Sequence, residues 1–246
     1  MKLKMKITRS ILSLVLVFTT LMVSPVIASA SNTTHITSSQ QQQDLELATK
    51  GTAQATKNLI NQLTPDKSEL ISATSSFSST EGPITKSIDL VNKKRIEALL
   101  KNPRVPQATK DILQQNIVTS IKLTVTEIPC NTPGDPYVQG SYTWCNYLGM
   151  ACIEYTVGQS FYYDGTNVTY VSTPINNPQT FMWGWSVSNV TNSLSSPIPY
   201  PTVASENEAV FSGSVPIIGL NLYTAHIYFH FTFYGNGTYV VTPNIF

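Results

Sequence analysis

The sequence predicts an α+β protein, in which an N-terminal helical segment precedes a mainly antiparallel all-β sandwich or open barrel. Apolar residues at helical spacing are confined to the chain before residue 118. After it, apolar and polar residues mostly alternate, with the period of two that is typical of strands. The alternation of side-chain types is strictest over residues 221–234. It predicts a long strand with one apolar face and one more polar, aromatic face. Turn residues and prolines recur between the alternating runs, as is typical of antiparallel sheets.

Residues 1–30 predict a secretory signal peptide. A basic start is followed by the apolar run Ile11–Val23 and by the small residues 28–30, which match a cleavage site. The apolar run is shorter than the roughly 20 residues that a membrane span needs. We therefore expect the mature protein to be secreted into the extracellular space, with no membrane span after removal of the signal.

Residues 31–83 predict a low-complexity leader with a weak helix and a linker. Residues 31–43 are polar and lack apolar periodicity, so we expect them to be disordered. A weak helix is predicted over 44–63, where apolar residues recur near heptad spacing although Gly51 interrupts them. The stretch 72–83 is rich in Ser and Thr and predicts the linker.

Residues 84–117 predict a helical hairpin. Apolar residues from Ile84 to Leu100 follow the spacing of an amphipathic helix, which we expect to end before Pro103. A second, shorter helix is predicted after Pro106, with its apolar residues on one face.

Residues 118–246 predict the antiparallel β-sandwich domain. Asp164-Gly165 separates two alternating runs and predicts a two-residue hairpin turn, because both residues tolerate positive φ. Phe181, Trp183 and Trp185 recur at every second position, which places them on one face of a further strand.

Charge divides the chain sharply. Of the 15 Lys and Arg residues, the last is Lys122. A segment without cations gains nothing from contact with phosphates, so we expect no nucleic-acid partner and no electrostatic binding to anionic membranes. Beyond Lys122 every formal charge is negative: Glu127, Asp135, Glu154, Asp164, Glu206 and Glu208.

The three cysteines predict one disulfide and one odd thiol in an exported protein. A two-residue turn at Leu148-Gly149 would place Cys145 opposite Cys152, in the wider type of antiparallel pair. We therefore favour a bond from Cys130 to one of these two over a bond between them. A catalytic or zinc-binding role is disfavoured, since no His is near in sequence and the spacing matches no zinc pattern.

Two of the three histidines, His226 and His230, fall on the long predicted strand with Tyr228 between them. Residues four apart on a strand lie about 13 Å apart, so these histidines cannot bind one metal ion together. We predict no metal and no cofactor. The row fits either the lining of a shallow groove or two partly buried histidines that are hydrogen-bonded across the sheet.

The second half of the chain is unusually rich in aromatic residues, surrounded by Asn, Gln, Ser and Thr. Such surfaces bind sugars, because rings contact the C–H faces of pyranoses and amides bond to hydroxyls. The leading hypothesis is a non-catalytic protein that binds carbohydrate or cell-envelope material, although the rings could equally form a ladder that only stabilises strand pairing. The candidate ligand-binding residues are His226, Tyr228, His230, Tyr234, Trp144 and Trp185.

Two other functions fit the same sequence. In one, the helical part is a pro-region whose removal releases a β-rich toxin or inhibitor, because every tryptic site lies in the first half. In the other, a hydrolase uses His226 or His230 with Asp164, Glu154 or Glu206. No pattern in the sequence predicts an oligomeric state.

Overall fold

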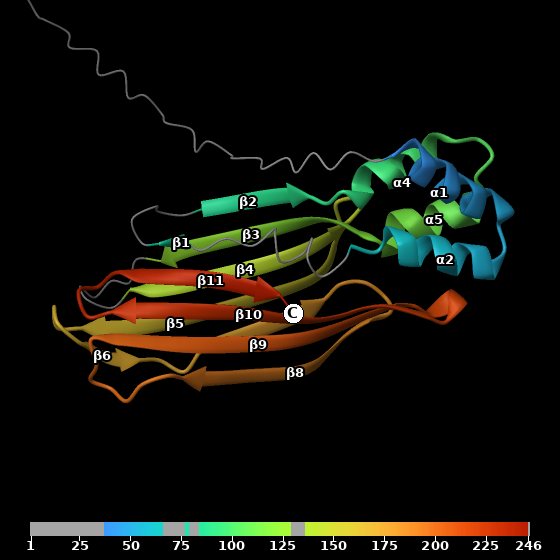
Figure 1. Ribbon diagram of the computed structural model, residues 1–246. Helices are drawn as coiled ribbons and strands as arrows, with labels where there is room; N and C mark the ends of the chain where they lie inside the picture. Colours follow the sequence, from blue (N-terminus) through green and yellow to red (C-terminus); the bar gives the residue numbers. More distant parts are fainter. Residues whose placement is uncertain (1–36, 66–76, 79–83, 129–135, 246) are drawn as a thin grey trace, which may run out of the picture.

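A computed structural model of the chain describes residues 37–65, 77–78, 84–128 and 136–245. It consists of a helical unit at one end of two stacked β-sheets (Figure 1). The predicted signal peptide and Cys130 lie outside the described residues. No helix among those residues combines the length and the apolarity that crossing a bilayer requires.

The helical unit has its own core. Arg95 donates two hydrogen bonds to the Asp44 carboxylate inside this unit, from Nε at 2.8 Å and from an Nη at 2.7 Å. Apolar residues of the four described helices form one buried cluster, and Ile218, Leu220 and Leu222 of the sheet region pack against it. The helices are α1 (Ser38–Lys50), α2 (Ala53–Leu63), α4 (Asn92–Lys101) and α5 (Gln107–Asn116).

The weak helix predicted over 44–63 is two helices. Gly51 adopts a left-handed conformation with φ 61°, which ends α1. Thr52 then caps α2, because its side chain accepts a hydrogen bond from the backbone N–H of Ala55. The expected disorder of residues 31–43 is wrong for Ser38–Gln43, where Thr37 caps α1 and tertiary packing holds the helix.

The first sheet has six strands in the order β2-β3-β4-β5-β6, and β7 pairs with β5 beside β6. All of its described pairs are antiparallel. Its strands are β2 (Ile84–Asp89), β3 (Val118–Ile128), β4 (Tyr137–Asn146), β5 (Ala151–Tyr163), β6 (Val168–Val171) and β7 (Ile175–Thr180).

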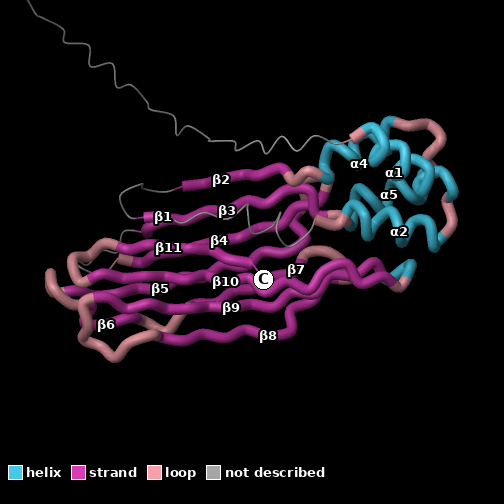
Figure 2. Tube along the Cα trace, in the orientation of Figure 1, coloured by secondary structure: helices cyan, strands magenta, loops and turns pink. Residues whose placement is uncertain are grey.

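The second sheet has five strands in the order β1-β11-β10-β9-β8, also antiparallel throughout. Figure 2 shows the helices grouped at one end of the strands. The long strand predicted over 221–234 is β10, which lies at the centre of this sheet. A short 3-10 helix, η2 (Pro216–Ile218), joins β9 to β10. The strands are β1 (Phe77–Ser78), β8 (Trp185–Leu194), β9 (Thr202–Val215), β10 (Leu220–Tyr234) and β11 (Tyr239–Ile245).

The inner face of β10 supplies the centre of the core. Its alternate residues from Tyr223 to Phe233 are buried against the other sheet, and the intervening residues are half-buried or exposed, as the period of two predicts. Phe229 lies so close to Gly140 of β4 that a Cβ on this glycine would be 2.6 Å from the ring. The predicted α+β class with a sandwich is therefore confirmed.

The helix predicted from Ile84 is wrong in its first six residues, which form β2. Ile84 pairs with Val125 and Ile88 pairs with Ile121 on β3. Residues four apart share a face in a strand as well as in a helix, so the spacing of these two isoleucines fits both. The part of the predicted 72–83 linker that is described, β1, is also a strand and pairs with β11.

Two further details differ from the predictions. The hairpin at Asp164-Gly165 is present but longer, because Tyr163 pairs with Val168 and the Asp164 carboxylate accepts backbone hydrogen bonds from Thr166 and Asn167. Residues 181–184 form a loop between β7 and β8 rather than a strand. Phe181 and Trp183 are consequently exposed, whereas Trp185 begins β8 and is buried.

Candidate functional site

The outer face of β10 carries the row predicted from the sequence. His226, Tyr228 and His230 alternate with buried residues, so all three side chains leave the sheet on the side away from the core. Tyr234 continues this face at the end of the strand, opposite Thr202 of β9. Each of the four residues is half-buried. The structure therefore brings these four predicted site residues together on one face.

The structure adds two carboxylates to this row. Glu208 of β9 lies opposite Tyr228, and its Oε1 is 2.5 Å from Nδ1 of His226. Its other carboxylate oxygen, Oε2, accepts a hydrogen bond at 3.2 Å from the Thr191 hydroxyl on β8. The His226 side chain is 43% exposed and that of Glu208 is 16% exposed, so the pair lies at the surface of the sheet.

The pKa of Glu208 results from opposing effects. Burial raises this pKa, but hydrogen bonds from His226, Tyr228 and Thr191 together outweigh burial and leave it below its ordinary value. The pKa of the Tyr228 hydroxyl is raised, first by burial and then by its hydrogen bond with Glu208. Glu208 therefore stays ionised at neutral pH, and Tyr228 stays neutral.

A second pair of a histidine and a carboxylate lies further along β10 and β9. His230 lies directly opposite Glu206, with Nδ1 3.3 Å from Oε1. The Glu206 side chain is 61% exposed and that of His230 is 40% exposed. The His226 and Tyr228 rings are nearly parallel, with centroids 6.5 Å apart and an interplanar angle of 15°. The face, which we call the β9–β10 row, consists of Glu206, Glu208, His226, Tyr228, His230 and Tyr234.

Trp144 and Trp185 do not belong to this row. Their positions disagree with the prediction that they bind a ligand. Both are buried on the inner side of the sheets. Their rings meet edge to face at 6.1 Å, and both contact Tyr223, with centroids 5.6 and 5.4 Å away. The sequence does not distinguish these core rings from exposed ones, because both kinds alternate in strands.

The cysteines also differ from the predicted arrangement. A bulge next to Trp144 shifts the register, so Cys145 lies opposite Ala151 rather than Cys152. Cys145 and Cys152 are free thiols, and the predicted bond from Cys130 involves a residue outside the described ranges. Burial raises the pKa of the Cys152 thiol to about 12, with a smaller contribution from Cys145. A thiol in this state is a poor nucleophile.

The acidic partners proposed for a hydrolase are dispersed. Asp164 lies in the β5–β6 turn, and Glu154 lies on β5 of the other sheet, where it accepts a hydrogen bond from Thr156. Of the three predicted acids only Glu206 lies beside a histidine. Within the described part of the chain, no three His, Cys, Asp or Glu side chains converge as a metal site requires.

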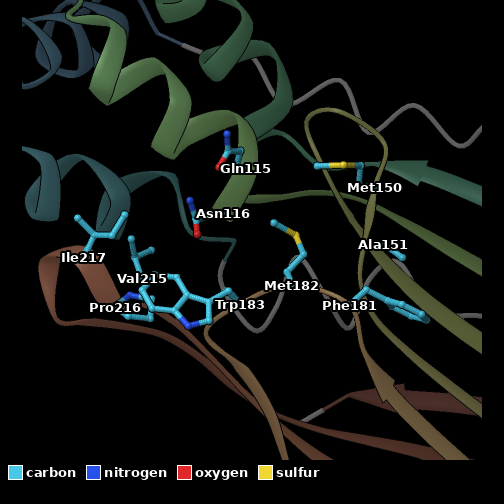
Figure 3. Close-up of a pocket in the computed structure, with 10 residues that line it drawn as sticks. All are labelled: Gln115, Asn116, Met150, Ala151, Phe181, Met182, Trp183, Val215, Pro216 and Ile217. Carbon is cyan, nitrogen blue, oxygen red and sulfur yellow. The ribbon is translucent and has the colours of Figure 1, made fainter.

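A second concave feature lies where the helical unit meets the sheets. A cleft of about 520 Å³ opens between α5, the β4–β5 turn, the loop 181–184 and η2 (Figure 3). No local pattern in the sequence predicts this cleft, because its walls come from four distant segments. Its lining residues are Gln115, Asn116, Met150, Ala151, Phe181, Met182, Trp183, Val215, Pro216 and Ile217.

The row and the cleft are the two candidate sites that we consider in the described structure. Comparisons of the chain with protein-family models, curated proteins and solved structures find no match.

Proposed function

We propose that this is a secreted, non-catalytic protein that binds an uncharged polysaccharide, such as cell-envelope or environmental glycan, through the β9–β10 row. The observation that carries the proposal is the pair of nearly parallel, half-buried rings of His226 and Tyr228 directly beside two carboxylates. Aromatic rings contact the apolar C–H faces of sugars, while carboxylates accept hydrogen bonds from hydroxyl groups.

The surroundings of the row support a neutral ligand. Thr191 of β8 and Thr242 and Asn244 of β11 flank it with uncharged polar groups. The acidic pair of Glu206 and Glu208 would repel an anionic polymer, and the chain has no Lys or Arg after Lys122 to offset that repulsion. An uncharged, hydroxyl-rich polysaccharide avoids this electrostatic repulsion.

The test is retention of the purified protein on insoluble glycans of known composition, with cell-wall and plant polymers in parallel. We expect retention on at least one polymer and its loss in Tyr228→Ala. Tyr200→Ala is the matched control, because Tyr200 is an exposed tyrosine outside the row. The absence of retention on every polymer, or equal retention by both variants, would refute the proposal.

One alternative, hydrolysis, draws support from the His226–Glu208 pair. A carboxylate that holds one ring nitrogen of a histidine orients the ring for general base catalysis. His226→Asn and His230→Asn, made separately, test this alternative on the glycan that is retained. Release of soluble sugar by the wild-type protein and its loss in one variant would establish hydrolysis, whereas unchanged polymer supports pure binding.

The other alternative, removal of a helical pro-region, is less well supported. Strands β1 and β2 precede α4 in the chain, yet they pair with β11 and β3 of the two sheets. Cleavage before residue 118 would detach both strands and also uncover Leu220 and Leu222, which pack on the helical core. Limited trypsin digestion tests this alternative, and a stable fragment with new activity would support it.

A further inference from the structure

The cleft at the junction of the helical unit and the sheets has an apolar rim that is open to solvent. Ile217 of η2 is 76% exposed and Trp183 of the 181–184 loop is 71% exposed. Phe181 and Met150 are also exposed on the same cleft. Water in contact with apolar side chains that line a concave site is unfavourable. A ligand that covers these side chains removes that cost.

The size and lining of the cleft fit a small molecule. Its volume of about 520 Å³ lies within the range of ligand sites in proteins. Met150 and Met182 reach into it from two segments (Figure 3). Methionine side chains are flexible and polarisable, so they adapt to an apolar group without a fixed shape.

No charged residue is among the ten that line the cleft. Several polar groups on its wall are already hydrogen-bonded: the backbone N–H of Phe181 donates to the backbone carbonyl of Cys152, and that of Met150 donates to the Asn146 side-chain oxygen. Asn116 donates its amide hydrogen to the Ile112 carbonyl at 3.0 Å. A peptide backbone placed here would lose hydrogen bonds to water and regain few, whereas an aliphatic chain has none to lose.

We propose that this cleft binds the single aliphatic chain of an uncharged amphiphile. The chain lies against Trp183, Met182 and Ile217, and its polar end stays in solvent near Gln115. The absence of charge on the wall excludes a strong contribution from an ionic headgroup, so affinity depends on chain length. This site is separate from the β9–β10 row and does not rest on the carbohydrate proposal.

Tryptophan fluorescence measures the binding directly. Among the three tryptophans, Trp144 and Trp185 are buried and Trp183 is exposed, so a change in emission reports on the cleft. The probes are straight-chain alcohols from hexanol to dodecanol, titrated into the full-length mature protein. We expect a blue shift with protection from acrylamide quenching. Affinity should rise roughly fourfold for each added CH₂ until the cleft is filled.

Two isoleucine variants distinguish the cleft from general surface binding. Ile217→Glu places a charge on the rim and should weaken dodecanol binding at least tenfold. Ile175→Glu is the matched control, because Ile175 is 63% exposed on β7 and does not line the cleft. Equal affinity in the two variants, or affinity independent of chain length, would overturn the proposal.

Two other occupants are tested by vesicle sedimentation and by the same fluorescence signal. Neutral phosphatidylcholine vesicles should not sediment the protein, because the cleft has room for one chain and not for a bilayer surface. Without any alcohol, the emission maximum should not change with protein concentration. A shift that occurs only with vesicles would assign the cleft to a membrane, and a concentration-dependent shift would assign it to a second copy; either result contradicts the proposal.

Discussion

Nδ1 of His226 lies 2.5 Å from Oε1 of Glu208, across the β10–β9 pair and on the face of the sheet that is turned away from the core. His226 itself faces Val210, so its ring reaches diagonally towards the carboxylate beside Tyr228. This contact connects the aromatic row to the acidic residues of β9. It also makes part of the stability of the sheet dependent on pH.

Glu208→Gln should reveal that dependence. The pKa of Glu208 in the folded protein is below its ordinary value of 4.5, so its contribution to stability is present above this value and is lost as the pH falls through the folded pKa. We expect the variant to be less stable than the wild type by about 1 kcal/mol near neutral pH. The difference should shrink in strongly acidic solution.

Urea unfolding at a series of pH values measures this effect. Glu206→Gln is the control, because Glu206 is largely exposed and its contact with His230 is longer, at 3.3 Å. A stability difference for Glu208→Gln that stays constant from neutral to acidic pH would contradict the assignment.

The ion pair of Asp44 and Arg95 should control the stability of the helical unit. Both side chains are buried, and Arg95 also donates to the Gln62 carbonyl at 2.9 Å. Arg95→Ala leaves a buried carboxylate without its partner, so we expect a loss of roughly 3–5 kcal/mol. Helix content followed by circular dichroism during thermal unfolding measures it.

A double variant separates the charge effect from packing. Asp44→Leu combined with Arg95→Met removes both charges and should recover most of the stability lost in Arg95→Ala. Lys93→Ala breaks the exposed pair with Asp89 and should change little. If the double variant is no more stable than Arg95→Ala alone, the loss is due to packing and not to the unpaired carboxylate.

Asn92 should couple the helical unit to the first sheet. Its buried amide donates to the carbonyl oxygens of Leu63 and Val118, both at 2.7 Å, and so connects the start of α4 to the end of α2 and the start of β3. Asn92→Ala leaves two carbonyls without this donor, and we expect a loss of about 2 kcal/mol.

Hydrogen exchange measures whether this loss is shared between the helices and β3. Asn58→Ala on the exposed side of α2 is the matched control and should leave exchange unchanged. Faster exchange limited to α4, with β3 unaffected, would show that Asn92 stabilises its own helix and does not couple the two parts.

Gly140→Ala should disturb the contact between the sheets. The new methyl group would lie 2.6 Å from Cε1 of Phe229, which is fully buried and cannot move freely. We expect a loss of about 1–3 kcal/mol from overpacking, measured by chemical denaturation. Adding Phe229→Leu makes room for the methyl group, so the two changes should be less than additive. Strict additivity would contradict a direct clash.

The cysteines can be distinguished by their reactivity in a Cys130→Ser background. Cys152 is fully buried and its pKa is raised to about 12, so it should not react with a thiol reagent at pH 8 until the protein unfolds. Cys145 is half-buried, and its pKa is raised less strongly. Rapid native labelling of Cys130→Ser/Cys145→Ala would contradict the structure.

The parts of the fold that could be predicted from the sequence follow from local patterns of apolar and polar residues. The alternation from Tyr223 to Phe233 indicates which side of β10 is buried, because each strand residue points opposite to its neighbours. The same alternation places His226, Tyr228 and His230 on the outer face. The spacing of Ile84 and Ile88 predicts a helix, but a separation of four fits both the helical and the strand period, and only pairing with β3 decides between them.

Local patterns suffice to predict the α+β class, the central strand and the aromatic row, since these depend on periods of two and 3.6 along a continuous segment. The carboxylates that join the row, the core positions of Trp144 and Trp185, and the apolar cleft between four distant segments emerge from the folded chain alone. Strand register and the packing of layers bring together residues far apart in the chain, and no local spacing records those contacts.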